Sequence, residues 1–192
     1  MQELEERIIK EDKVLPGNII KVDGFLNHRI DTELMDHIAE EFGKHFNMDE
    51  VTMILTAEAS GIALSAIVAQ HFHKPMIFAK KAKSDNIEGG LYQSDIFSYT
   101  YKKKVTLLVS KEWMSADDKV LIIDDFMANG EAMRGLCDIV EAAGATLVGI
   151  GCAVEKGFQG GGDRLRAAGV NLHSLAIIES AEPGNIVFRD EN

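Results

Sequence analysis

The sequence predicts a single α/β domain with a mainly parallel sheet flanked by helices. Three apolar runs, at 51–56, 120–123 and 146–154, lack polar alternation, which is typical of strands buried on both faces of a parallel sheet. Segments with helical spacing of apolar residues follow the first two runs. At 192 residues and 46% hydrophobic composition the chain can bury one ordinary core, so we expect one domain over 1–192.

The other elements follow from periodicity and turn signals. Leu4, Ile8 and Ile9 share a helix face near the N-terminus, and Asp31 is a good N-cap for a helix that reaches Phe46. Gly144 is placed to end the helix that follows the 120–123 strand. In the first third of the chain we expect a helix at 1–11, extended residues at 14–22, a loop at 24–31, a helix at 32–46 and a strand at 51–56. The middle should hold a helix at 62–71, a strand at 75–79, a long polar loop at 80–91 and an antiparallel pair at 92–101 and 105–110. The last part should hold a strand at 120–123, a helix at 131–143, strands at 146–154 and 172–178, and an edge strand at 186–188.

Charge and composition exclude several classes of function. A formal net charge of −11 and a pI near 5.0 disfavour a nucleic-acid-binding surface, although Lys80, Lys81 and Lys83 form a local basic patch. Cys137 and Cys152 lack metal-type spacing and are interpreted as buried apolar residues. No apolar run reaches the roughly 18 residues of a membrane span, and the charged N-terminus does not look like a signal peptide. We therefore expect a cytoplasmic protein with no membrane or nucleic-acid partner.

The most informative segment is 120–132. Four aliphatic residues lead into Asp124 and Asp125, then an Ala-Asn-Gly turn, then a helical pattern that begins at Glu131. Carboxylates at the end of a buried strand can accept hydrogen bonds from sugar hydroxyls, and the amides of a turn at a helix N-terminus bind phosphate. The alternative, in which either aspartate only caps the helix, is weak for the pair. The segment predicts a site for a phosphorylated sugar.

A second turn precedes a helix at the other strand end. Glu58-Ala59-Ser60-Gly61 follows the 51–56 strand and offers backbone amides and the Ser60 hydroxyl to an anion. Taken alone, this turn is as easily a plain helix cap. Together with 120–132 it predicts two anion-binding turns at one edge of the sheet, which suits a substrate with phosphate at one end and diphosphate at the other.

The 120–132 segment resembles the phosphoribosyl pyrophosphate (PRPP) signature of the type I phosphoribosyltransferases. The resemblance implies that Asp124 and Asp125 bind the ribose hydroxyls and act in catalysis. It implies that Ala128, Asn129, Gly130, Glu131 and Ala132 surround the 5-phosphate, that Ser60 and Gly61 hold diphosphate on a strained peptide, and that Lys81 reaches the diphosphate. Mg²⁺ is then expected as a cofactor bound through PRPP, with no protein metal ligand assigned with certainty.

The chain departs from the general signature at three positions. The family usually has an acidic residue where this chain has Ala128, and hydroxyl residues where it has Asn129 and Ala132. Backbone amides still suffice for phosphate, but Ala128 cannot be a general base. A proton on the purine must be handled elsewhere or need no removal by the protein.

This variant resembles the bacterial xanthine phosphoribosyltransferases over nearly the whole chain. The matching segments are 21–28, 58–63, 121–126 and 155–159, and the first is the most discriminating. The resemblance implies that Ile20, Asn27 and Lys156 contact xanthine. An ammonium only donates hydrogen bonds, so Lys156 selects oxo groups or an anionic ring edge, and Asn27 can pair with the 2-oxo side. Phe158 could stack on the purine or pack in the core.

The expected function is therefore purine salvage, in which xanthine and PRPP become xanthosine 5′-monophosphate and diphosphate. By resemblance, elements from about 1–30 and 155–192 form a small base-binding hood, a flexible loop at about 80–104 covers the site, and the chain forms a homodimer. Two alternatives stay open: a hypoxanthine–guanine phosphoribosyltransferase, and a non-catalytic PRPP-sensing regulator. The regulator is disfavoured by the charge of −11 and because no winged-helix segment precedes the domain. The glycines at 160–162 fit neither a nucleotide nor a calcium loop and are interpreted as a flexible turn.

Overall fold

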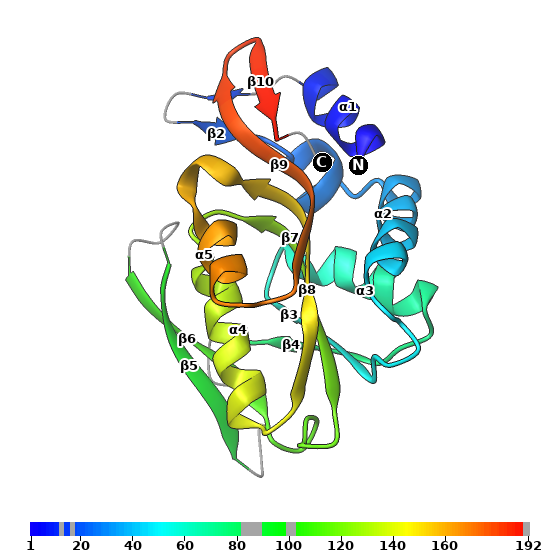
Figure 1. Cartoon of the computed structure of the whole chain (residues 1–192), viewed down its shortest axis with the longest axis vertical. Helices are drawn as coiled ribbons and strands as arrows, with labels where there is room; N and C mark the ends of the chain where they lie inside the picture. The colour runs from blue at the N-terminus through cyan, green and yellow to red at the C-terminus, as the bar shows by residue number, and fades with distance from the viewer. Residues whose placement is uncertain (12–13, 16–17, 82–89, 99–102, 190–192) are drawn as a thin grey trace.

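A six-stranded mixed sheet forms the centre of the computed structural model, which describes residues 1–11, 14–15, 18–81, 90–98 and 103–189. The strand order is β10-β9-β8-β7-β3-β4, and all neighbours are parallel except β9 and β10 (Figure 1). These strands are β3 (Met53–Ala57), β4 (Met76–Ala79), β7 (Lys119–Met127), β8 (Thr146–Lys156), β9 (Leu172–Glu182) and β10 (Asn185–Phe188). The predicted α/β fold with a mainly parallel sheet is confirmed.

Helices cover both faces of this sheet. The helices α2 (Thr32–His45) and α3 (Gly61–His71) lie on one face, and α4 (Glu131–Ala142) and α5 (Gly161–Ala167) on the other (Figure 1). The predicted N-cap of α2 is correct, because the Asp31 carboxylate accepts a hydrogen bond from Leu34 N at 3.3 Å. Gly144, with φ +70°, follows α4 as expected. Two apolar clusters result, one on each side of the sheet.

The antiparallel pair lies outside α4. Strands β5 (Leu91–Ser98) and β6 (Lys103–Ser110) pair along their whole length, and residues 82–89 and 99–102 lie outside the described residues. The Ser94 hydroxyl donates to Asp138 Oδ2 at 2.7 Å, and Arg134 Nη2 donates to Asp95 O at 2.8 Å. These bonds tie the described part of the predicted covering loop to α4. The mobility of 80–104 stays a prediction.

The N-terminal elements and the C-terminal strands gather at one end of the molecule (Figure 1). Helix α1 (Gln2–Glu11) precedes two short antiparallel strands, β1 (Val14–Leu15) and β2 (Ile19–Ile20). The expected loop at 24–31 is wrong in part, because Asp23–Asn27 form one π-helical turn, η1, with Phe25 and Leu26 fully buried. Two buried apolar residues in five pull this segment into the core. A separate hood formed by 1–30 and 155–192 stays a prediction.

Candidate functional site

The carboxyl ends of β3 and β7 open into a pocket of about 210 Å³. Because the two strands are parallel neighbours, the turns that follow them meet at the same edge of the sheet. Strand β5 borders one side of this pocket through Ile96 and Phe97. The other lining residues are Ala57, Glu58, Ser60, Lys81, Asp124, Phe126, Met127, Ala128, Asn129, Gly130, Glu131, Ala132 and Met133. Most of the predicted PRPP residues are therefore brought together.

Asp124 and Asp125 lie at the end of β7, and both are buried. The Asp125 backbone N–H donates to Asp124 Oδ1 at 3.0 Å. Burial, followed by the charge of Asp125, raises the pKa of Asp124 well above its usual range, and the nearby Lys81 acts in the opposite direction. Asp124 thus holds its negative charge less readily than a free aspartate would, and a ligand that donates hydrogen bonds to it would favour the charged form.

The turn after β3 contacts this aspartate pair directly. The peptide bond between Glu58 and Ala59 is cis. The Ser60 hydroxyl donates to Asp125 Oδ1 at 2.9 Å, and Ser60 makes no side-chain cap bond to α3, so the plain helix-cap alternative does not hold. A Cβ added at Gly61 would lie 2.3 Å from Asp124 Oδ1, so a larger residue there would displace the carboxylate.

Lys81 follows β4 and borders the same pocket. Its backbone N–H donates to Glu58 Oε1 at 2.5 Å, which joins the end of β4 to the turn after β3. Lys80 instead forms a backbone bridge with Leu108 of β6. Of the two lysines, Lys81 is the one that lines the pocket of Asp124 and Ser60. Its contact with diphosphate stays a prediction.

Helix α5 packs against the loop between β7 and α4. Gly130 has φ +76°, and the helix begins at Glu131. A Cβ added at Gly161 would lie 2.4 Å from Ala128 O, and Arg164 Nη2 donates to Asn129 O at 3.1 Å. The interpretation of 160–162 as a flexible turn is therefore wrong, because Gly161 and Gly162 form the start of α5, and Gly161 allows that helix to approach Ala128 closely.

Lys156 is 9% exposed, at the end of β8. Its Nζ donates to Asn18 O at 2.9 Å and lies 5.3 Å and 5.9 Å from the ring centroids of Phe126 and Phe158. Burial lowers its pKa. Ile20, also buried, lies two residues from Asn18 in β2. An ammonium group flanked by aromatic rings is suited to a flat ring that carries oxygen acceptors.

Asn27 joins the two halves of the site. Its side-chain Nδ2 donates to Asp125 Oδ2 at 3.0 Å, across 98 residues of sequence. The predicted base-contacting residue therefore touches the predicted ribose-binding carboxylate. Ile20, Asn27 and Lys156 do not line the 210 Å³ pocket itself, and Phe126 is the residue that borders both that pocket and Lys156.

Sequence reasoning missed several contributors. Gly161 and Arg164 lie against the 128–132 turn, and Ile96 and Phe97 lie beside the pocket. The glycine run at 160–162 is visible in the sequence but was interpreted as a flexible turn, and no local motif marks Ile96 or Phe97. Phe126 had a usable signal, because it directly follows the two aspartates.

The donor set fits a magnesium ion that is held mainly by substrate. Among the described residues, no group of three or more histidine, cysteine, aspartate or glutamate side chains could form a protein metal cage. Mg²⁺ is nevertheless commonly bound by one or two protein carboxylates when substrate phosphates supply its other oxygen ligands, and two carboxylates lie beside the 128–132 turn. Asp124 and Asp125 would contact the ion or its water shell.

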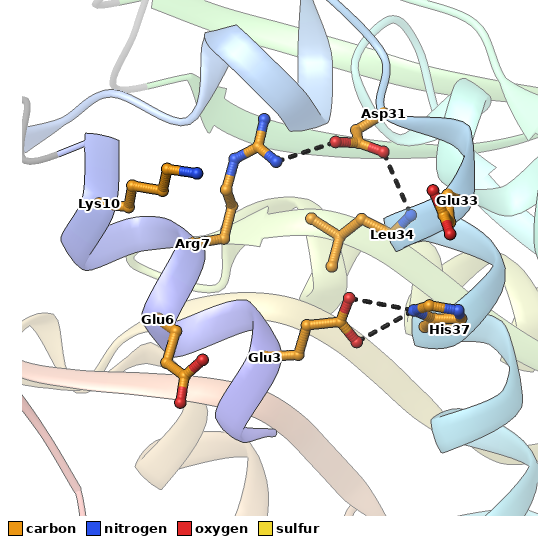
Figure 2. A pocket seen from close by; sticks show the side chains of 8 residues that line it. All are labelled: Glu3, Glu6, Arg7, Lys10, Asp31, Glu33, Leu34 and His37. Atoms are coloured by element: carbon orange, nitrogen blue, oxygen red, sulfur yellow. Dashed lines mark hydrogen bonds and ion pairs between the residues drawn. The ribbon is translucent and has the colours of Figure 1, made fainter.

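A larger cleft, of about 370 Å³, lies elsewhere, between α1 and α2. Figure 2 shows Glu3 facing His37 and Arg7 facing Asp31 across this cleft. Glu3 contacts His37 Nδ1 through both carboxylate oxygens at 3.0 Å, and Arg7 Nη1 donates to Asp31 Oδ2 at 2.9 Å. These groups hold α1 against α2, so we assign this cleft a structural role.

Comparison with known proteins decides the family. Residues 25–166 match the phosphoribosyl transferase domain. The chain belongs to the phosphoribosyltransferase family. It is similar to the xanthine phosphoribosyltransferases of Bifidobacterium animalis subsp. lactis, with 53% identity over 98% of this chain and 100% of the relative, and of Lachnoclostridium phytofermentans, with 51% identity over the full length of both. The predicted resemblance to bacterial xanthine phosphoribosyltransferases is confirmed.

Solved structures of this family share the fold. Adenine phosphoribosyltransferase from Rhodothermus marinus matches with a TM-score of 0.72 and 21% identity, over 93% of this chain and 100% of that one. The enzyme from Trypanosoma brucei, in complex with AMP, pyrophosphate and ribose-5-phosphate, also gives 0.72 at 21% identity, over 91% and 78%. At this identity the likeness concerns the fold.

Among the described residues, none of the helices has the length and apolar character needed to span a membrane.

Proposed function

We propose that this phosphoribosyltransferase converts xanthine and PRPP to xanthosine 5′-monophosphate and diphosphate. The observation that carries the proposal is the hydrogen bond between Asn27 and Asp125, which joins the turn predicted to contact the base to the carboxylate predicted to bind ribose. The relatives named xanthine phosphoribosyltransferase, at 45–54% identity over nearly the whole chain, support xanthine as the purine.

Each part of the site has a chemical task in this reaction. Asp124 and Asp125 accept hydrogen bonds from the ribose hydroxyls and orient the sugar. The amides of 128–132 bind the 5-phosphate at the N-terminus of α4, and the 58–61 turn with Lys81 binds the diphosphate. The purine lies beside Lys156, with Ile20 as an apolar wall, Asn27 near its 2-oxo side and Phe158 in reach of its ring.

Departure of diphosphate leaves positive charge on the sugar, and the purine nitrogen attacks the opposite side of C1. Asp124 and Asp125, both buried, would stabilise that charge. Mg²⁺, bound through PRPP, would neutralise the leaving diphosphate. Since Ala128 cannot accept a proton, the proposed substrate is a purine that loses its proton readily. Xanthine does so near neutral pH.

The deciding experiment compares kcat/KM for xanthine, guanine and hypoxanthine with PRPP and Mg²⁺. We expect xanthine to be preferred by at least about tenfold, which corresponds to roughly 1.4 kcal/mol of differential transition-state binding. A preference for guanine or hypoxanthine would replace the proposal with a hypoxanthine–guanine phosphoribosyltransferase. Tight operator DNA binding at physiological salt without diphosphate release would favour the PRPP-sensing regulator, which a net charge of −11 disfavours.

We further propose, from the family resemblance, that the chain acts as a homodimer in the cytoplasm, without nucleic-acid or membrane partners. Sedimentation of the purified protein measures the first of these directly. A monomer at micromolar concentration with full activity would contradict a dimer that is needed for function.

A further inference from the structure

We propose that Asn27 is a positioning residue for PRPP as well as a contact for the purine, because it orients the Asp125 carboxylate before either substrate binds. This inference rests on the proposed function and deepens it. It predicts that a residue of the base-recognition turn controls the affinity for the sugar substrate.

The first step is the state of Asp125. Its side chain is 1% exposed, and each of its two oxygens accepts a hydrogen bond from a different segment: Oδ1 from Ser60 at 2.9 Å and Oδ2 from Asn27 at 3.0 Å. A buried carboxylate depends on such donors, because the loss of one leaves an oxygen desolvated. The two donors together fix the plane of the carboxylate.

The second step is the orientation of the Asn27 amide. A carboxylate accepts only, so the nitrogen side of the amide must face Asp125. A purine at Lys156 would then meet an Asn27 side chain whose position Asp125 has already determined. The hydrogen bond therefore couples the binding of the purine to the binding of PRPP. By thermodynamic linkage, each substrate changes the affinity for the other by the same factor.

The third step is the rigidity of the turn that carries Asn27. The Arg7 guanidinium lies 5.2 Å from the ring centroid of Phe25 and pairs with Asp31 (Figure 2). Asp31 N in turn donates to Phe25 O at 2.9 Å. Helix α1 and the N-cap of α2 thus both contact η1 at Phe25, and these contacts hold the turn that carries Asn27.

The test measures PRPP binding in the absence of any purine, by calorimetric titration of PRPP with Mg²⁺ into the full chain. Asn27→Ala should raise the Kd for PRPP by about tenfold, which is the loss of affinity expected when one hydrogen bond to a charged group is removed. Asn27→Gln, which keeps an amide donor, should recover part of it. Asn47→Ala is the matched control, because Asn47 Nδ2 donates to Glu50 Oε1 at 2.9 Å on the exposed end beyond α2, and it should leave the Kd unchanged.

A double-mutant cycle shows whether Asn27 acts through Asp125. In the Asp125→Asn background, Asn27→Ala should have no further effect on the Kd for PRPP. Additive losses, or an Asn27→Ala variant that binds PRPP as the wild type does and loses only xanthine affinity, would overturn the inference. Failure of the wild-type chain to bind PRPP at all would instead overturn the proposed function. Circular dichroism melts identify any variant that has lost its fold.

Discussion

Asp125 accepts hydrogen bonds from two side chains that were predicted to contact different parts of the substrates. Ser60 belongs to the turn predicted to hold diphosphate, and Asn27 to the turn predicted to contact the purine. Both predictions assigned these side chains to ligands alone. At the residue scale, the structure adds that each also supports the carboxylate predicted to bind ribose.

Lys156 gives the first prediction at this scale. Lys156→Met keeps the apolar stem and removes the ammonium that lies between Phe126 and Phe158. We expect kcat/KM for xanthine to fall by at least about tenfold, or 1.4 kcal/mol, because the donor to the oxo groups is lost. Steady-state kinetics with varied xanthine measures this.

The control for Lys156→Met is Lys111→Met. The Lys111 Nζ lies 5.1 Å from the ring centroid of Tyr92, so the substitution removes a similar cation–π contact on the hairpin. It should leave kcat/KM for xanthine unchanged. A wild-type value in Lys156→Met would remove Lys156 from the base site.

At the element scale, short helices support the site from outside it. Helix α5 lies against the phosphate loop through Gly161 and Arg164, and α1 holds η1 through Arg7. Neither helix supplies a predicted ligand contact of its own. Changes in them should therefore act on substrate binding through the loops that they hold.

Gly161→Ala tests the contact between α5 and the phosphate loop. The added methyl group would lie 2.4 Å from Ala128 O, so the loop has to move. We expect the KM for PRPP to rise by about tenfold or more, since small displacements of a binding loop are costly, while the KM for xanthine changes little. Ala167→Ser, at the exposed end of α5, is the control and should leave both constants unchanged. Unaltered PRPP kinetics in Gly161→Ala would show that the loop tolerates the shift.

The attachment of α1 to α2 should depend on pH. The hydrogen bond to the Glu3 carboxylate, then its charge, raises the pKa of His37, and Glu33 and Asp36 act in the same direction. Because the folded pKa lies above the unfolded one, this stabilisation is present below the unfolded pKa of about 6.5 and is lost as the pH rises through the folded value. The Tm of wild type relative to His37→Gln should therefore be higher at pH 6 than at pH 8.5, by about 1 °C for an exposed pair. Thermal melts at both pH values measure the difference, and an equal difference would argue that the Glu3 contact contributes nothing.

At the scale of the whole molecule, the candidate site is built from parts of the chain that meet only on folding. They are β2, η1, the turn after β3, the end of β4, β5, the end of β7 with the start of α4, and the end of β8. A ligand that contacts several of them binds the folded state and not the unfolded chain. PRPP binding should consequently be visible as global stability.

PRPP with Mg²⁺ should raise the Tm of the full chain. At a concentration of 100 Kd the gain is about 2.7 kcal/mol, which for a domain of this size corresponds to roughly 5–10 °C. Differential scanning calorimetry measures the shift. Chelation of the metal with EDTA should reduce the shift, and the absence of any shift at saturating PRPP would contradict the proposed site.

The sequence alone determined the α/β fold, the order of most elements and the segment 120–132, because these depend on local periodicity and on motifs within a few residues. Asp124, Asp125 and the phosphate loop are neighbours in the chain, so their proximity needed no tertiary information. The π-helical turn at 23–27 was missed, because burial of Phe25 and Leu26 in a distant core overrides a local loop signal.

Only the tertiary structure decided which side chains from distant segments meet. The Asn27–Asp125 bond spans 98 residues and the Arg164–Asn129 bond spans 35. Such contacts arise from the parallel order of β3, β7 and β8, which brings their following turns to one edge of the sheet. No sequence pattern within a single segment predicts these contacts, since the two partners come close to each other only when the sheet has formed.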